Sequence, residues 1–158
     1  MERSTQQAYL SGLKLLARRE LSEAQLRTRL ARHFDAGQID EAVDRLRQER
    51  ALDDRRTALA CARTAVRVHQ RGRARVVRQI EAMGISRDLA RAAANEVFAE
   101  LDEAALLEQA LDRRLRRGIA LDDPPSARRV FRYLIGQGFE ADRVSAALKS
   151  RIKHQSRI

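Results

Sequence analysis

The sequence has few of the residues that support a disulfide framework, an aromatic-rich core or a membrane span. Its 158 residues include one cysteine, two prolines and no tryptophan, and aromatic residues make up 4%. The single cysteine, Cys61, cannot form an internal disulfide. No apolar segment approaches the roughly 20 residues that cross a bilayer, and the N-terminus lacks the apolar run of a signal peptide. These absences predict a soluble, cytoplasmic protein with no membrane partner.

Charged residues and good helix formers are abundant instead. Charged residues make up 34% of the chain and hydrophobic residues 44%. The composition favours Ala, Leu, Arg and Glu, which lose little side-chain freedom in a helix. Apolar residues recur at steps of three and four, which is the helical period rather than the period of a strand. Composition and period together predict an all-α protein.

One apolar pattern occurs three times. Its members are Leu26, Leu30, Phe34, Ile39, Val43 and Leu46 in the first copy, Val76, Ile80, Ile85, Ala90, Ala94 and Val97 in the second, and Val130, Leu134, Phe139, Val144 and Leu148 in the third. Repeated units that contact only their neighbours stack into elongated arrays. We predict three tandem three-helix repeats, at residues 1–53, 54–102 and 103–158, forming an elongated, curved helical-repeat body.

Capping residues predict where the helices begin and end. Ser22 and Gln25 match a capping box, and Gly72, Gly84 and Gly118 are expected to end helices in the left-handed conformation. Further helix starts are expected at Asp53–Asp54, at Ser86 and at Pro124–Pro125. The helices after the first are predicted to span about Ser22–Arg32, Gln38–Arg50, Asp54–Gln70 and Arg73–Met83, followed by four more to the C-terminus.

The net charge of +10 is distributed in blocks. Residues 1–54 carry ten Lys/Arg against ten Asp/Glu, whereas residues 55–91 carry ten arginines against two acids. Residues 92–112 hold six acids and no base, and residues 113–158 hold twelve bases and four acids. Such blocks favour a polyanion or an acidic protein surface as partner. A solvated basic face with no partner explains the same pattern and stays open.

Arginines in the two basic blocks recur at helical steps of three or four, so that they can line one face and follow a phosphate backbone or an acidic groove. Few aromatic residues are available for base stacking, which argues against single-strand recognition of that kind. The candidate binding residues are Arg63, Arg67, Arg71, Arg73, Arg75, Arg78, Arg113, Arg114, Arg116, Arg117, Arg128, Arg129 and Arg132.

Residues that could carry catalysis or hold a metal are sparse. The pairs Asp53–Asp54 and Asp122–Asp123 can bind a divalent cation, but helix capping explains them and no ligating His or Glu accompanies them. Cys61 is expected to be a small buried residue rather than a nucleophile. No Gly-rich phosphate loop is present, and the histidines match no zinc spacing. We predict a protein that is not an enzyme, with no catalytic residue, metal or cofactor. The histidines are His33, His69 and His154.

Two stretches of the sequence resemble a known family. Ala8–Tyr9 through Leu15–Glu20, with Ser22 and the Leu26/Leu30 pair, is similar to the N-terminal module of the RecX family, the regulatory proteins of the bacterial recombinase RecA. The second module of that family resembles a stretch of this chain between residues 52 and 85, and four short segments carry the resemblance. These are Leu52–Asp54, Arg71–Gly72, Arg78–Ile80 and Gly84–Ile85.

The resemblance implies three tandem three-helix repeats, no catalysis, and binding to RecA or to the RecA–DNA nucleoprotein filament. It implies inhibition of the recombinase and of the associated ATPase and coprotease activities, with weak direct DNA binding. Two other functions remain open from the residues alone: an independent, sequence-nonspecific DNA-binding repeat protein, or an assembly adaptor for an acidic protein.

Two features depart from the family pattern. Thr57 and Cys61 stand where aromatic residues are expected, and the turn at Arg32–Phe34 lacks a glycine and is one residue shorter than its counterparts. We therefore expect this turn to be capped differently.

Overall fold

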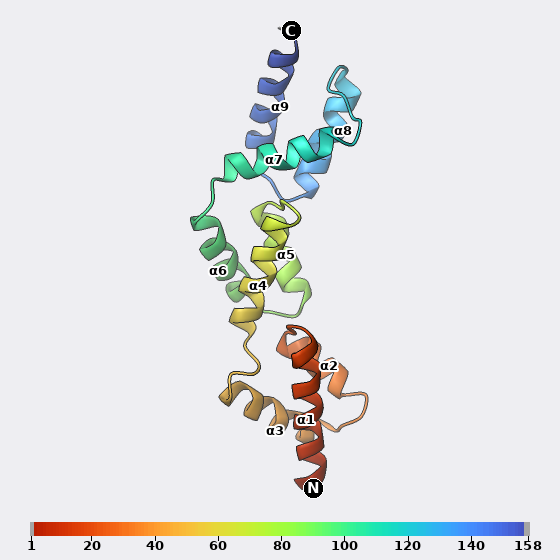
Figure 1. The fold of residues 1–158 in the computed structure, drawn as a ribbon, viewed down its shortest axis with the longest axis vertical. Coiled ribbons are helices and arrows are strands. Elements are labelled where there is room, and N and C mark those ends of the chain that lie inside the picture. The colour runs from red at the N-terminus through yellow and green to blue at the C-terminus, as the bar shows by residue number, and fades with distance from the viewer. Residues whose placement is uncertain (1, 157–158) are drawn as a thin grey trace.

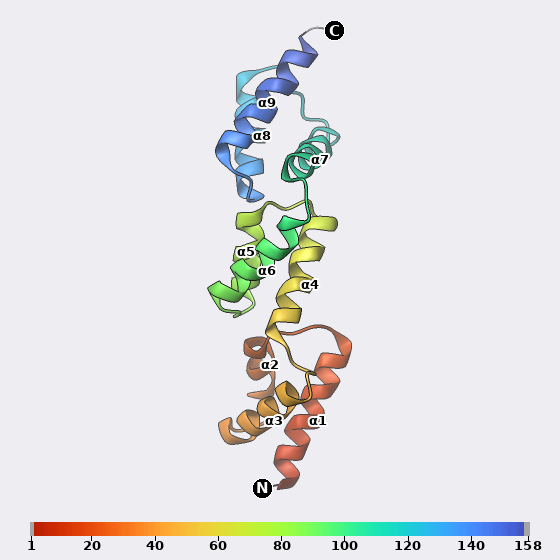
Figure 2. The same ribbon diagram turned by 90° about the vertical axis from the view of Figure 1, so that its left-hand side faces the viewer.

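The computed structural model describes residues 2–156, and this part of the chain folds into nine α-helices with no strand. The helices follow one another along a long axis in three groups of three, with the termini at opposite ends (Figure 1), and a view turned by 90° shows the same succession (Figure 2). The predicted all-α array of tandem three-helix repeats is confirmed. The helices are α1 (Glu2–Arg18), α2 (Glu23–Leu30), α3 (Ala36–Gln48), α4 (Asp54–Arg67), α5 (Arg73–Ala82), α6 (Arg87–Ala99), α7 (Glu103–Leu115), α8 (Pro124–Gly136) and α9 (Ala141–Gln155).

Buried apolar residues form three clusters, one in each group of helices. In the first, Leu26, Val43 and Leu46 are fully buried where α1 and α2 pack against α3. The repeating apolar pattern supplies five of the ten buried residues in the first cluster, five of thirteen in the second and four of eight in the third. These residues meet because positions three and four apart share one face of a helix. Three pattern residues, Phe34, Val97 and Phe139, are only partly buried at the edges of the clusters, and Phe98 is buried in the second cluster in place of Val97.

The predicted caps form at most helix ends. Ser22 Oγ accepts a hydrogen bond from the Gln25 amide at 3.1 Å, and Gln25 Oε1 accepts one from the Ser22 amide at 3.2 Å, which completes the capping box. Ser86 caps α6, and Gly84 ends α5 with φ +79°. Pro124 and Pro125 occupy the first turn of α8 behind the N-cap Asp123.

The prediction that Gly72 ends α4 in the left-handed conformation is wrong. Gln70 takes that conformation, with φ +47°, and Gly72 begins α5 as its N-cap with φ −75°. A Cβ on Gly72 would lie 2.5 Å from the carbonyl oxygen of Gly138 in the last repeat. Glycine is therefore needed for a close approach of two backbones, which local sequence does not reveal.

Several predicted helix bounds also shift. The second helix ends at Leu30 rather than Arg32, since the Leu30 carbonyl accepts the amides of both His33 and Phe34 in a tight turn. The third helix spans Ala36–Gln48 rather than Gln38–Arg50, because Asp35 provides its N-cap. The fourth ends at Arg67 rather than Gln70 and the fifth at Ala82 rather than Met83.

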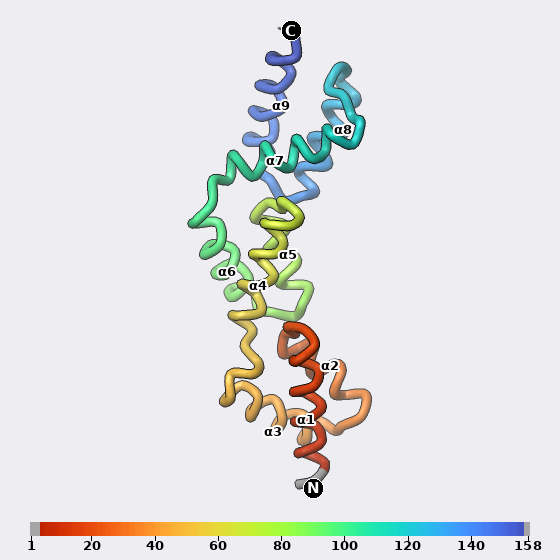
Figure 3. Tube along the Cα trace, viewed as in Figure 1, coloured from red at the N-terminus to blue at the C-terminus, as the bar shows by residue number. Residues whose placement is uncertain are grey.

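Successive repeats meet through the same pair of elements. The turn before the third helix of one repeat lies against the start of the second helix of the repeat before it, as the chain trace in Figure 3 shows. At the first junction, Ser22 at the start of α2 donates its hydroxyl hydrogen to the Met83 carbonyl. At the second, the Gly72 amide donates to the Gln137 carbonyl at 2.8 Å and the Ala74 amide to the Gly138 carbonyl at 3.3 Å.

The two outer ends of the array lack these docking groups. Among residues 2–156, the turn before α3 makes no backbone hydrogen bond to another repeat, and no residue in it has a positive φ. This placement accounts for the short turn without glycine. At the other end, Pro125 in α8 corresponds to Ala74 in α5, and proline has no amide hydrogen to donate.

Candidate partner-binding surface

The candidate arginines lie in different surroundings, so they are described in groups. Arg63 and Arg67 on α4 line a shallow hollow together with Glu96 and Glu100 of α6. The acidic block of the sequence thus lies beside part of the basic block. Because Glu96 and Glu100 line the same hollow, their carboxylates offset the positive potential of Arg63 and Arg67.

Arg73 is held in ion pairs inside the protein. It donates to Glu103 Oε1 at 2.5 Å and to Asn95 Oδ1 at 2.6 Å, and its guanidinium lies 5.0 Å from the centre of the Phe98 ring. Glu103 also accepts from Arg143 at 3.3 Å. Arg73 therefore links α5 to α6 and α7, and its charge is compensated.

A third group gathers around Tyr133 of α8, where the second and third repeats meet. Arg114 of α7 stacks on Tyr133, with its guanidinium carbon 4.3 Å from the ring centre. Arg75 of α5 donates to the Gly136 carbonyl at 3.1 Å. Arg71, in the loop before α5, is half-buried, and both Arg75 and Tyr133 are close enough to affect its pKa. We call Arg71, Arg75, Arg114 and Tyr133 the Tyr133 cluster.

The Tyr133 cluster is positively charged without a compensating acid. Burial lowers the pKa of Arg71, and the nearby positive charge of Arg75 lowers it further. No carboxylate of the described residues contributes to that shift. The Nε atoms of Arg71 and Arg114 are buried and have no hydrogen-bond partner within residues 2–156. Buried donors and like charges are both stabilised by an anion, so this surface is suited to a negatively charged partner.

The remaining candidates surround the Tyr133 cluster or lie farther along the third repeat. Arg113 lies beside the cluster and is held by two hydrogen bonds, which it donates to the Val68 carbonyl at 2.8 Å and to Gln70 Oε1 at 2.6 Å. The others have exposed side chains and extend the basic surface over α5, α8 and the end of α7. They are Arg78, Arg116, Arg117, Arg128, Arg129 and Arg132.

Sequence reasoning did not identify Tyr133 as part of a site. Tyr133 lies three residues after the buried Val130 and directly before the buried Leu134 on α8, so the sequence pattern indicates a residue at the edge of the core. Its contact with Arg114 depends on how α7 crosses α8, which no local pattern specifies.

Comparison with known proteins places the chain in a family. A protein from Syntrophotalea carbinolica named regulatory protein RecX is 36% identical over 134 residues, which cover 84% of this chain and 88% of that protein. The chain belongs to the RecX family. Regulatory protein RecX from Halorhodospira halophila is 31% identical over 140 residues and that from Pelodictyon phaeoclathratiforme 26% over 139 residues, each covering 87% of this chain.

A family model of the first RecX domain and two RecX crystal structures also match this chain. The family model for the first three-helix domain of RecX matches residues 8–46. The crystal structure of RecX from Lactobacillus salivarius superposes with a TM-score of 0.81 over 95% of this chain and 97% of that one, at 14% identity. A second RecX crystal structure has a TM-score of 0.76, at 20% identity, over 93% of this chain and 72% of that one. These two likenesses support the fold.

Membership of the RecX family gives the chain a regulatory role. In this RecX-family chain the aspartate pairs contribute caps, since Asp53 accepts from the Arg56 amide and Asp123 from the Ser126 amide. No group of three or more His, Cys, Asp or Glu side chains suited to a metal occurs within residues 2–156. Burial raises the pKa of the Cys61 thiol, which disfavours the nucleophilic thiolate. Among the described helices, none is long and apolar enough to span a membrane.

Proposed function

We propose that this RecX-family protein regulates RecA by binding RecA or the RecA–DNA filament. In this proposal it inhibits the recombinase together with the associated ATPase and coprotease activities. It acts in the cytoplasm through binding alone and performs no chemistry itself. Weak direct DNA contact is part of the proposal.

The observation that carries the proposal is the Tyr133 cluster. Its arginines come from three different elements, and two of them, Arg75 and Arg114, are held by contacts within the protein, so these two lose little freedom on binding. The cluster lacks a compensating carboxylate among the described residues. A nucleoprotein filament offers both phosphates and acidic side chains, and either would pair with these guanidinium groups.

A second candidate function is independent, sequence-nonspecific DNA binding. The exposed arginines of α8 favour it, because phosphate contacts carry no sequence information. An adaptor for another acidic protein is the third candidate. The three differ in which partner must be present for an effect.

A titration of RecA bound to single-stranded DNA distinguishes the three functions. We expect the protein to suppress ATP hydrolysis at concentrations that leave naked DNA largely unbound. Inhibition that only follows the sequestration of DNA would favour the second function. Binding to an acidic protein other than RecA, with no effect on the filament, would favour the third.

The double variant Arg71→Glu with Arg75→Glu tests the Tyr133 cluster. It should weaken inhibition and flatten its salt dependence, since each lost phosphate contact removes about 0.7 to 0.9 from the log–log salt slope. Contacts to acidic side chains of RecA would be screened without that fixed increment.

The matched control is Arg19→Glu with Arg32→Glu in the first repeat, where both side chains are exposed. Arg45 and Arg47 are unsuitable as controls because they pair with Glu49 and Glu23 at 2.9 and 2.8 Å. Circular dichroism establishes that both double variants fold. If the control loses as much inhibition as the cluster variant, the Tyr133 cluster is not the binding surface.

A further inference from the structure

A cleft lies on the other flank of α5 from the Tyr133 cluster. Its volume is about 490 Å³, within the range of protein ligand sites. Residues 73, 74, 77 and 81 of α5 line it, together with parts of α6, α7 and α9. Arg75 falls between the lining positions in sequence and therefore points to a different side of the helix. Arg78 also lines the cleft and lies three residues from Arg75, so the second junction carries two adjacent surfaces that meet along α5.

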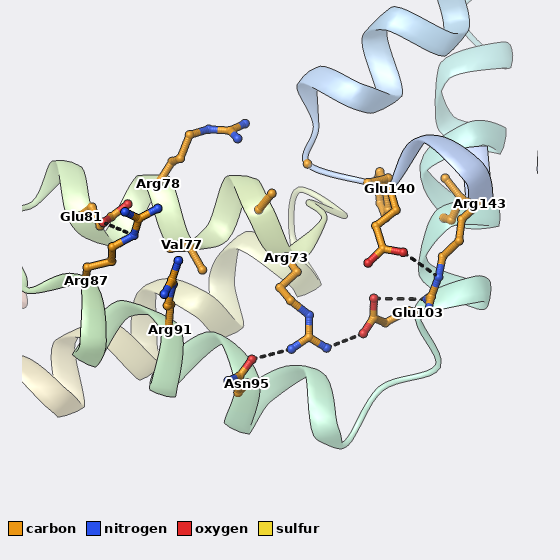
Figure 4. Close-up of a pocket in the computed structure, with 14 residues that line it drawn as sticks. Arg73, Val77, Arg78, Glu81, Arg87, Arg91, Asn95, Glu103, Glu140 and Arg143 are labelled. Atoms are coloured by element: carbon orange, nitrogen blue, oxygen red, sulfur yellow. Dashed lines mark hydrogen bonds and ion pairs between the residues drawn. The ribbon is translucent and has the colours of Figure 1, made fainter. Parts of the chain in front are cut away.

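Three arginines form the rim of this cleft. Figure 4 shows Arg91 extending from α6 toward Val77, with Arg87 beside it and Arg78 at the outer edge. Arg87 makes only a long contact of 3.6 Å with Glu81. Within residues 2–156, neither Arg78 nor Arg91 has an ion-pair partner at 4.0 Å or less. The rim therefore carries positive charge that the protein leaves largely uncompensated.

Three acids line the cleft: Glu81 lies at the rim, 3.6 Å from Arg87, and the other two are engaged on the opposite side. Glu103 accepts from Arg73 at 2.5 Å and from Arg143 at 3.3 Å, and Glu140 lies 3.4 Å from Arg143 (Figure 4). These pairs fix the wall formed by α7 and α9. They do not neutralise the rim, because both carboxylates pair with Arg143 and Glu103 also pairs with Arg73.

The floor of the cleft is apolar. Val77, Leu107 and Phe139 line it, and Leu107 is only 3% exposed. A phosphate backbone gains nothing from such a floor, whereas a bulky apolar side chain gains about 25 cal/mol for each Å² that it buries. Floor and rim together fit a ligand with both an apolar group and negative charge.

The start of α9 adds hydrogen-bond donors at the edge of the cleft. Its N-cap, Glu140, makes no side-chain cap hydrogen bond, and no side chain among the described residues replaces it. The first amides of a helix carry partial positive charge and favour a carboxylate. This feature supports the arginine rim and does not by itself define a site.

We propose that this cleft binds an acidic segment of a partner protein. One bulky apolar side chain of that segment rests on Val77, Leu107 and Phe139. Its flanking carboxylates pair with the rim arginines Arg78, Arg87 and Arg91. The proposal goes beyond the regulatory function described above and holds whether or not the Tyr133 cluster contacts DNA.

Fluorescence anisotropy on the full chain tests the proposal with three probes. The first is a short fluorescein-labelled peptide of Asp and Glu with a central Phe, the second replaces Phe by Ser, and the third is an oligothymidylate. We expect the Phe peptide to bind more tightly than the Ser peptide. Arg87→Glu with Arg91→Glu should weaken Phe-peptide binding about tenfold or more, since it reverses two charges at the rim. Oligothymidylate binding should change far less.

The control is again Arg19→Glu with Arg32→Glu, which makes the same change in net charge on an exposed surface outside the cleft. Equal loss of peptide binding in the control and the rim variant would overturn the proposal, as would equal binding of the Phe and Ser peptides. A parallel loss of oligothymidylate binding in the rim variant would make the cleft a nucleic-acid surface instead. RecA is absent from this assay, so its outcome is independent of filament inhibition.

Discussion

The two junctions between repeats share one geometry and differ in their chemistry. In both, a turn of the later repeat lies against the start of the second helix of the earlier repeat. At the first junction side chains make many of the contacts. Asp54 accepts from the Glu23 amide at 2.8 Å, and Arg56 pairs with Glu20 at 2.9 Å. Charges at this junction are matched within the protein.

The second junction is built mainly from backbone groups. Two glycines, Gly72 and Gly138, let the chains approach closely enough for amides of one repeat to donate to carbonyls of the next. Backbone contacts do not need the acidic side chains that the first junction uses. Arg73 and Arg143 at this junction pair with Glu103, but five arginines of the Tyr133 cluster and the cleft rim have no carboxylate within 4.0 Å among residues 2–156. They are Arg71, Arg75, Arg78, Arg91 and Arg114. One stacking geometry is thus built from matched side chains at one junction and mainly from backbone groups at the other.

Separating the first repeat from its junction should have the largest effect. We expect a fragment of residues 1–53 to show little helicity and no cooperative thermal transition. Fewer than about 60 residues bury too little surface to fold reliably alone. In addition, Ser22 and Glu23 lose their partners Met83 and Asp54. A sharp thermal transition, followed by circular dichroism, would contradict the dependence of each repeat on its neighbour.

Gly138→Ala should cause the next largest loss, in the backbone-built junction. Gly138 has φ +97°, and a Cβ there would lie 2.7 Å from Arg75 Cβ and 2.8 Å from the Gly72 carbonyl oxygen. Backbone strain costs about 1–2 kcal/mol and overpacking about 1–3 kcal/mol. We therefore expect the free energy of unfolding in urea to fall by about 2–5 kcal/mol.

Gly118→Ala is the matched control for that loss. Gly118 has a similar φ of +85°, but a Cβ there would meet no atom within 4 Å. It should lose only the strain contribution, about 1–2 kcal/mol. Equal losses in the two variants would show that the close backbone approach contributes nothing to stability.

This contrast also explains what the sequence could and could not predict. Gly84 and Ser86 were identified correctly because capping depends on residues within one turn of the chain. Gly72 was misassigned because its small size serves a contact with Gly138, far away in sequence. Arg73 was grouped with a binding face, yet its partner Glu103 lies in the next repeat. Local periodicity predicts helices and cores, whereas junction contacts depend on how the repeats stack.

A smaller effect is expected at Thr57, which occupies a position where the family pattern suggests an aromatic residue. Its side chain is 1% exposed, and its hydroxyl lies 3.0 Å from Glu20 Oε2 and 3.4 Å from the Leu21 carbonyl oxygen. Thr57→Val keeps the shape but removes the hydroxyl, so the free energy of unfolding should fall by about 1 kcal/mol. Thr64→Val on the same helix is the control, because Thr64 is exposed. Equal changes would mean that the hydroxyl of Thr57 does not strengthen the first junction.

The smallest effect is the pH dependence of the first junction, which is carried by Asp54. Burial raises the pKa of this carboxyl above its ordinary value of 3.8, although the hydrogen bond from the Glu23 amide opposes the shift. A raised pKa in the folded state means that the unfolded chain loses this proton at a lower pH. The contribution of Asp54 to stability therefore falls as the pH rises from 3.8 through the folded-state pKa.

Asp54→Asn keeps an oxygen to accept the Glu23 amide and removes the titration. Unfolding free energies of the variant should decline less than those of the wild type over this interval, and NMR titration of the Asp54 carboxyl carbon should give the raised pKa directly. A carboxyl that titrates below its ordinary value would show that the Glu23 hydrogen bond outweighs burial, and the wild type would then gain stability relative to the variant as the pH rises.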